Sequence, residues 1–200
     1  MDKFNIKPAP MISTELKKLI RPLIIVQQVI WFAITGSIVF YAVIAYILVG
    51  SGGTDDISRS RGLGTALYVA ALAVAICSIF YRRYSMSDKS ITKILSRNID
   101  PARLAQNART KSIDSVKLGQ LESLTEFELK VFSLMYELQK ITFISLFLNE
   151  IMVIIGFVLA FLSGDPANIL PFAVISLVLS FWMFPRSGKL IERARYLYAT

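Results

Sequence analysis

Glu150 is the one charged side chain inside four long apolar runs of this chain, and it directly follows Asn149. It lies eight residues after the start of the run Thr142–Leu162, which in a helix is roughly 12 Å along the axis. A carboxylate at that depth in a bilayer is costly unless it faces protein or water. Tyr41 and Tyr46 also lie deep in an apolar run, and their hydroxyls need partners on neighbouring helices or at Glu150. These four residues are the candidates for a buried polar or ion-handling site.

Two interpretations of Glu150 stay open. In the first, the carboxyl is protonated or hydrogen-bonded to Asn149 or to a tyrosine, serine or threonine of another helix, and it holds the helices in register. In the second, it handles protons or ions, as intramembrane carboxylates of transport proteins do.

The stretch Glu150–Ala160 resembles the carboxylate helix of the proteolipid c subunits of rotary ATPases. In that family a membrane carboxylate is followed within a few residues by a glycine, here Gly156, and by an aliphatic and alanine run. The resemblance implies that Glu150 is a proton- or sodium-binding carboxylate. It covers about eleven of the 200 residues. The chain departs from the family in its first apolar run, which holds only Gly36 where the family has closely spaced glycines.

The composition excludes several kinds of chemistry. The chain has no histidine and one cysteine, Cys77, so it has no histidine-ligated haem or metal site and no intrachain disulfide. We find no nucleophile–base pair, no glycine-rich phosphate loop and no metal-ligand spacing. The sequence therefore predicts no catalytic residue, no metal and no cofactor, and a protein that is not an enzyme.

The apolar residues, 54% of the chain with a mean hydropathy of +0.57, are concentrated in blocks. Four blocks are long enough, or nearly so, to cross a bilayer as helices: Leu23–Val49, Leu63–Tyr81, Thr142–Leu162 and Ile169–Phe184. The last is the shortest, and its Pro171 is best placed in the first turn, where the missing N–H costs least. We predict an all-α polytopic membrane protein with four transmembrane helices arranged as two hairpins, and a small helical cytoplasmic segment between them.

The positive charges indicate the orientation. All but two of the 22 lysines and arginines lie in the N-terminal tail, the central segment or the C-terminal tail. By the positive-inside rule, these three regions are cytoplasmic, in a multi-pass protein of the inner membrane with both termini inside. The predicted regions are a tail with an interfacial helix (1–22), a first transmembrane hairpin (23–81), a cytoplasmic helical segment (82–140), a second hairpin (141–184) and a C-terminal tail (185–200).

Small residues predict how the transmembrane helices pack. One face of the second helix carries Ala66, Ala70, Ala73 and Cys77, a spacing that lets helix backbones approach closely in lipid. Since Ala71 and Ala75 repeat the pattern on a neighbouring face, we expect this helix to be the most enclosed one. Gly156 should allow a similarly close approach on the third helix.

The central segment carries helix signals. Asp88 is expected to cap a short helix, Asp100 to cap another that runs to Ala108, and Thr125 to form a capping box with Glu128. That box opens a helix that continues to Leu162 without a break. A seam of apolar residues at spacings of three and four precedes the third apolar run and consists of Leu124, Phe127, Val131, Leu134, Leu138 and Ile141. This seam either packs on this chain's own short helices or docks another subunit.

Basic residues also follow the second apolar run, where they are candidates for binding lipid head groups: Arg82, Arg83, Lys89, Lys93 and Arg97. No nucleic-acid-binding module is recognisable. The expected partners are the bilayer with its anionic lipids and either other membrane subunits or further copies of the chain. We therefore expect a non-catalytic accessory or scaffold subunit, or a small homo-oligomer, with ion translocation through Glu150 as the alternative.

Overall fold

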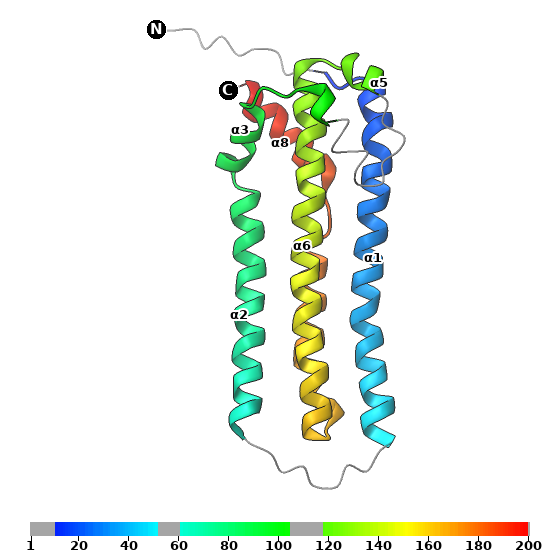
Figure 1. Cartoon of the computed structure of the whole chain (residues 1–200), viewed down its shortest axis with the longest axis vertical. Helices are drawn as coiled ribbons and strands as arrows, with labels where there is room; N and C mark the ends of the chain where they lie inside the picture. The colour runs from blue at the N-terminus through cyan, green and yellow to red at the C-terminus, as the bar shows by residue number, and fades with distance from the viewer. Residues whose placement is uncertain (1–10, 52–60, 105–117, 200) are drawn as a thin grey trace. The chain divides into compact units, whose positions relative to one another are not determined.

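The computed structural model describes residues 11–51, 61–104 and 118–199, and every regular element within them is a helix (Figure 1). This confirms the all-α prediction for the described residues. The elements are α1 (Thr14–Ser51), α2 (Arg61–Ser85), α3 (Asp88–Leu95), α5 (Leu118–Glu122), α6 (Glu126–Ser163), η1 (Pro166–Ile169), α7 (Leu170–Trp182) and α8 (Ser187–Ala199).

Three of these helices, α1, α2 and α6, are long and apolar enough to cross a membrane. A fourth span is counted only if Pro166–Trp182 and the following α8 are taken together as one broken span. The 38 residues of α1 and of α6 give each a length of about 57 Å, more than the ~30 Å hydrocarbon layer needs. The chain is therefore a helical protein with the features of a membrane-embedded one.

The contacts divide the chain into two compact units. Unit 1 comprises residues 1–26, 84–140 and 185–200, and unit 2 comprises residues 27–83 and 141–184. The two predicted hairpins at 23–81 and 141–184 fall mainly within unit 2.

Unit 1 has its own apolar core, built from the first turns of α1 and α6 together with α3, α5 and α8. Leu16 and Ile20 of α1 are buried there. The described part of the interfacial helix predicted in residues 1–22 is the start of α1, and it packs into this core. Residues 1–10 lie outside the described residues.

The apolar seam at the start of α6 is also internal. Five residues of the seam lie in unit 1, namely Leu124, Phe127, Val131, Leu134 and Leu138. They are buried in this core beside Ile91 and Leu95 of α3 and Leu190 of α8. Ile141, the sixth, is buried as well. The interpretation of the seam as a docking surface for another subunit is wrong, because this chain's own helices cover it.

The predicted capping box at the start of α6 is confirmed. The backbone N–H and the hydroxyl of Thr125 donate to Glu128 Oε2 at 3.0 and 2.9 Å, and Glu128 N–H donates back to Thr125 Oγ1 at 3.4 Å. Glu128 Oε1 accepts from the N–H of Ser13, which precedes α1, at 2.8 Å. Burial alone would raise the pKa of Glu128, but the hydrogen bonds from Ser13 and Thr125 outweigh it, so the pKa lies below its ordinary value of 4.5.

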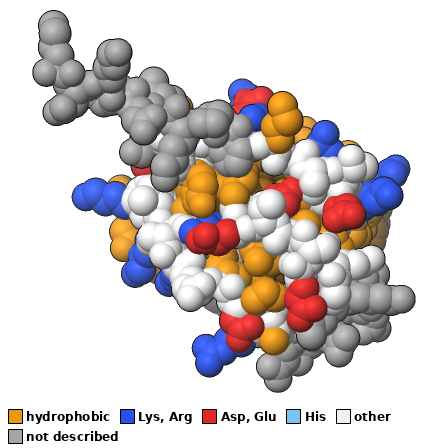
Figure 2. Space-filling view, turned by 90° about the horizontal axis from the view of Figure 1, so that it is seen from above, with side chains coloured by type: hydrophobic (Ala, Val, Ile, Leu, Met, Phe, Trp, Pro, Cys, Tyr) orange, Lys and Arg blue, Asp and Glu red, His pale blue; other side chains and the backbone are white. Residues whose placement is uncertain are grey.

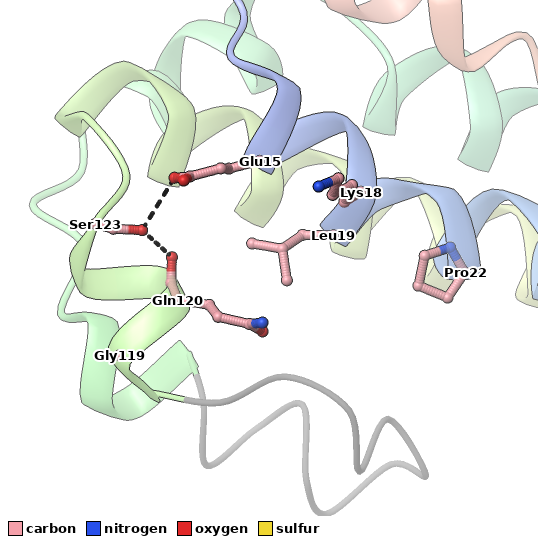
Figure 3. Close-up of a pocket in the computed structure, with 7 residues that line it drawn as sticks. All are labelled: Glu15, Lys18, Leu19, Pro22, Gly119, Gln120 and Ser123. Atoms are coloured by element: carbon pink, nitrogen blue, oxygen red, sulfur yellow. Dashed lines mark hydrogen bonds between the residues drawn. The ribbon is translucent and has the colours of Figure 1, made fainter.

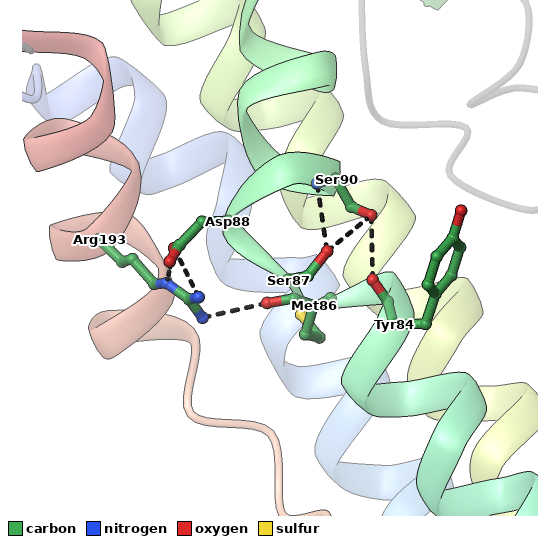
Figure 4. A network of polar contacts seen from close by, with 6 residues as sticks. All are labelled: Tyr84, Met86, Ser87, Asp88, Ser90 and Arg193. Atoms are coloured by element: carbon green, nitrogen blue, oxygen red, sulfur yellow. Dashed lines mark hydrogen bonds and ion pairs between the residues drawn. The ribbon is translucent and has the colours of Figure 1, made fainter.

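The contact between α3 and α8 involves Asp88, which was predicted to cap α3; this prediction is wrong (Figure 4). Ser87, and not Asp88, is the N-cap of α3, since its hydroxyl accepts from Ser90 N–H at 3.3 Å. Asp88 instead binds Arg193 of α8, whose Nε lies 2.7 Å from Asp88 Oδ1. A serine hydroxyl caps as well as a carboxylate, which leaves the aspartate free for the ion pair.

The next predicted cap is confirmed. Asp100 Oδ1 accepts from Ala102 N–H at 2.9 Å, and residues 101–104 are helical. The predicted continuation of this helix to Ala108 lies outside the described residues.

In unit 2, α6 is the most buried of the three long helices, and α2 is the least. The buried share of the most apolar stretch is 44% for α6 and 17% for α2. The helix α2 contacts α6 through Ala71 and Ala75, which are buried near Met152 and Phe172. The prediction that α2 is the most enclosed helix is therefore wrong. The face next to the predicted packing face is buried instead. The predicted packing face is exposed in the chain on its own, and it consists of Ala66, Ala70, Ala73 and Cys77.

Gly156 lies where α6 comes close to α7. A Cβ added there would meet Phe172 at 2.7 Å, at its Cβ, Cγ and Cδ2 atoms. The Phe172 ring in turn stacks on Tyr68 of α2, with ring centroids 4.9 Å apart. Only a glycine fits this contact, because any other side chain would push Phe172 out of its place. Pro171 lies in the first turn of α7, as predicted, and Asp165 caps η1, which precedes α7.

Candidate functional site: a polar spine in unit 2

Asn149 is the centre of the polar contacts inside unit 2, and its side chain is almost fully buried, with 1% exposed. Its Oδ1 lies 3.1 Å from Ser78 Oγ of α2, and its Nδ2 donates to Ser180 Oγ of α7 at 3.4 Å. Ser176 Oγ of α7 donates to the Asn149 carbonyl at 2.9 Å. One amide thus joins three helices.

Further bonds on the same face of α6 extend this centre. Ser78 Oγ also lies 3.2 Å from the carbonyl of Ser145, whose own hydroxyl donates to the Ile141 carbonyl. Thr142 Oγ1 accepts from Gln27 Nε2 of α1 at 2.9 Å. The spacing of Thr142, Ser145 and Asn149, three and four residues, places them on one helical face. We call these three residues and their hydrogen-bond partners on α1, α2 and α7 the polar spine.

Trp31 connects α1 to α7. Its indole N–H donates to the carbonyl of Ser180 at 2.7 Å, and its ring packs edge-on against Phe181 and Phe184. An indole buried in an apolar environment needs such a partner, and the bond secures a contact between helices that are distant in sequence.

Glu150 points to α1 rather than into the polar spine. Its Oε1 accepts from Ser37 Oγ at 3.0 Å, and the carboxyl is half-buried. Glu150 was one of two kinds of partner predicted for Tyr41 and Tyr46, and neither tyrosine is bonded to it among the described residues. Tyr41 is half-buried against Phe157, with ring centroids 5.8 Å apart, and Tyr46 is exposed. The four predicted polar residues are thus not one site: Asn149 is in the spine, Glu150 pairs with Ser37, and the tyrosines lie elsewhere.

Two buried polar atoms of unit 2 have no hydrogen-bond partner among the described residues. They are Thr35 Oγ1 on α1 and Arg82 Nη1 at the end of α2. Of the five basic residues predicted to bind head groups, Arg82 is half-buried, whereas the other four are exposed: Arg83, Lys89, Lys93 and Arg97.

Unit 1 has an open hollow of about 540 Å³ between α1 and α5. Glu15, Lys18 and Gln120 are among its lining residues, and Ser123 Oγ lies 3.3 Å from Glu15 Oε2 (Figure 3). These polar groups are exposed to water. Figure 2 shows acidic and basic side chains interspersed with apolar ones on one face of the molecule.

The spine's other members were missed at the level of sequence. Four of them, Gln27, Ser78, Ser176 and Ser180, are scattered through three apolar runs. Two polar residues outside the spine, Trp31 and Ser37, were missed as well. A signal was present, because Ser176 and Ser180 are four residues apart and Thr142, Ser145 and Asn149 share one helical face. In a bilayer such residues bind other helices, since no water is available to them.

The arrangement suits the joining of helices. Its groups are hydroxyls, amides and carbonyls that are bonded to one another, and no group of three metal-ligating His, Cys, Asp or Glu side chains occurs within residues 11–51, 61–104 and 118–199. Comparisons of the chain with protein families, with curated proteins and with solved structures found no match.

Proposed function

We propose that this protein is a non-catalytic scaffold or accessory subunit of a membrane complex, or a small homo-oligomer. It crosses the inner membrane four times as two hairpins, with both termini and residues 82–140 in the cytoplasm. The distribution of basic residues supports this orientation. The length of Pro166–Trp182 supports a short fourth span, because four residues of 3₁₀-helix and thirteen of α-helix extend about 28 Å.

The observation that carries the proposal is the division between the two faces of α2. Its inner face is engaged with α6 through Ala71, Ala75 and Ser78. Its outer face presents small residues at spacings of four, three and four, all exposed: Ala66, Ala70, Ala73 and Cys77. Small residues on a lipid-facing surface let another transmembrane helix approach closely, with van der Waals packing as the driving force. The docking face is therefore on α2.

The chain provides a direct test of this face, because Cys77 is its one cysteine and is exposed. Mild oxidation of native membranes should give a Cys77-dependent disulfide, either to a second copy or to a partner subunit. Ala70→Leu should abolish the product by separating the helices, whereas Val69→Leu, at an exposed neighbouring position on α2, should not. A protein that purifies as a monomer with turnover of its own would refute the scaffold function.

The orientation has a separate test. Reporters fused after Ala108 and Thr200 should indicate the cytoplasm, and reporters after Gly53 and Pro166 the opposite side. An exchange at any of these positions would exclude the two-hairpin topology without bearing on the α2 face.

The alternative function, ion or proton translocation through Glu150, is favoured by one geometric detail. Ser37 Oγ carries a single proton and lies 2.8 Å from the Ile34 carbonyl and 3.0 Å from Glu150 Oε1. If Ser37 donates to Ile34, the contact with Glu150 needs a proton on the carboxyl; if Ser37 donates to Glu150, the carboxylate is satisfied while ionised. The pair thus accommodates both protonation states, as a translocating carboxyl requires.

Two substitutions separate a structural carboxyl from a translocating one. Glu150→Gln keeps the shape and the hydrogen bond to Ser37 but cannot ionise, whereas Glu150→Leu removes the polar group. A structural carboxyl tolerates Gln and loses about 1–3 kcal/mol with Leu. A translocating carboxyl fails with Gln although the protein folds and assembles. Full function of Glu150→Gln would exclude translocation through this residue.

A further inference from the structure

The carboxyl of Glu150 is only partly shielded by its own chain. Its Oε1 accepts from Ser37 Oγ at 3.0 Å, whereas Oε2 has no hydrogen-bond partner among the described residues. The side chain as a whole is half-buried, so the carboxyl lies at the surface of unit 2, along the edge where α1 contacts α6. In a bilayer this surface faces hydrocarbon, which offers a polar group no partner.

The apolar runs of the chain hold no cation for this carboxyl. Residues 22–58, 62–81 and 141–185 contain no lysine or arginine, and no ion pair joins Glu150 to a described residue. Along α6 the closest basic residue is Lys140, about 15 Å away along the helix axis. Because ionisable groups inside transmembrane helices pair with one another, the counter-charge for Glu150 has to come from another molecule.

A second copy of the chain does not bring a cation to this depth. The helices α2 and α6 are antiparallel, with Ser78 beside Asn149 and Gly64 beside Leu159. Arg82 therefore begins one turn beyond Ser78, on the side away from Glu150. In a symmetric pair of copies that cross the same bilayer, every residue keeps its depth, so the cation belongs to a different protein.

Glu150 also lies within a regular seam on the outside of α6. The seam residues follow one another at spacings of four, three, four, three and four: Phe143, Phe147, Glu150, Ile154, Phe157 and Phe161. Phe157 is half-buried against Tyr41 of α1, and the other four apolar residues of the seam are exposed. An average spacing of 3.5 residues is the pattern on which a second helix packs, and one polar position within it fixes the partner and the register.

We propose that this seam of α6 binds a transmembrane helix of another protein, and that a lysine or arginine of that helix pairs with Glu150. Ser37 orients the carboxyl through Oε1 and leaves Oε2 for the cation. The phenylalanines on both sides of Glu150 exclude water from the pair, which strengthens the attraction between the charges. The site rests on the scaffold function and deepens it by naming the chemistry of one partner, whereas the face of α2 is a separate contact.

A synthetic helix of leucine and alanine with one central lysine serves as the probe, and it carries a dansyl group at one end. Two control helices have leucine or glutamine in place of the central lysine, with identical ends. The full-length protein is reconstituted in vesicles of phosphatidylcholine, which have no net charge, and energy transfer from its two tryptophans, Trp31 and Trp182, measures binding. The wild type should bind the lysine helix about tenfold or more tightly than the leucine helix, as for a hydrogen bond between charged groups.

Variants of the protein locate the preference. Glu150→Gln keeps the bond to Ser37 and therefore the fold, which near-ultraviolet circular dichroism checks, but it should reduce the preference for lysine to less than about twofold. Glu137→Gln is the matched control, because it removes a partly exposed carboxylate from the same helix outside the seam, and it should keep the full preference. Phe147→Ala should weaken all three probes alike, since it removes a contact that does not depend on charge.

Two results would overturn the site: equal binding of the lysine and leucine helices by the wild type, or a preference for lysine that persists in Glu150→Gln. Equal binding of the glutamine and lysine helices would show a hydrogen-bonding partner instead of a cation. Self-association that Glu150→Gln abolishes in analytical ultracentrifugation would show a second copy as the occupant. Either of these results also refutes the cationic partner.

The α2 face is tested independently of this site. Ala70→Leu should leave the preference for lysine unchanged. A missing Cys77 disulfide together with an intact preference for lysine would therefore refute the α2 face alone, and the reverse combination would refute the seam of α6 alone.

Discussion

The contact of Gly156 with Phe172 makes a prediction that can be refuted in a simple pair of variants. Gly156→Ala would place a methyl group 2.7 Å from the Cβ, Cγ and Cδ2 atoms of Phe172. Cβ is bonded to the backbone and cannot swing away, and the ring that contains Cγ and Cδ2 is held by its stack on Tyr68. Overpacking of this kind costs about 1–3 kcal/mol.

The helix preference of alanine acts in the opposite direction. Replacing glycine within a helix gains up to about 1 kcal/mol relative to an unfolded chain, and less in a detergent in which helices persist after unfolding. The net expectation for Gly156→Ala is therefore a loss of about 1–2 kcal/mol. Gly36→Ala is the matched control, because Gly36 is also inside a long helix but has nothing within 4 Å of the added Cβ. It should leave the stability unchanged or raise it by up to about 1 kcal/mol.

The assay is denaturant titration in mixed micelles, with unfolding followed by near-ultraviolet circular dichroism. In the double variant with Phe172→Ala, two of the three close atoms are gone, so the effects should be non-additive by about 0.5–3 kcal/mol. If Gly156→Ala were as stable as Gly36→Ala, the close approach of α6 and α7 would be wrong.

Three other expectations follow from single contacts. Asn149→Leu should lower the free energy of unfolding by about 1–3 kcal/mol, because Ser180 Oγ loses its donor and Ser78 Oγ keeps only the Ser145 carbonyl; the same titration measures it, and no loss would contradict the polar spine. Because the pKa of folded Glu128 is lowered, its ionised form contributes stability above about pH 4.5 that is lost as the pH falls through the folded pKa. Glu128→Gln should therefore weaken the protein near neutral pH and flatten its acid dependence, and an unchanged acid transition in melts at a series of pH values would refute this. Asp88→Asn should cost less than about 1 kcal/mol, because its ion pair with Arg193 is exposed; a larger loss in a thermal melt would show that this pair holds α3 to α8.

Local signals in the sequence determined where helices begin and how apolar they are. The capping box of Thr125 and Glu128, the N-cap at Asp100 and the position of Pro171 each depend on residues within one turn of the chain, so spacing alone predicted them. The length of α6 followed in the same way, because nothing in Glu126–Ser163 interrupts the helix. The all-helical, membrane-type composition was equally readable, since burial in lipid requires backbone groups to be satisfied within each segment.

The tertiary structure decided which faces meet. Ala70 and Ala71 are equally small, and the sequence cannot tell which of them contacts α6, because in lipid an alanine is as favourable outside as inside. For the same reason the seam from Leu124 to Leu138 was compatible with both an internal core and a docking surface. Asn149, rather than its charged neighbour Glu150, became the centre of the polar contacts because one position along a helix rotates a side chain by about 100°. That rotation aims Asn149 at α2 and α7 and Glu150 at α1, which is a property of how the helices pack and not of the residues themselves.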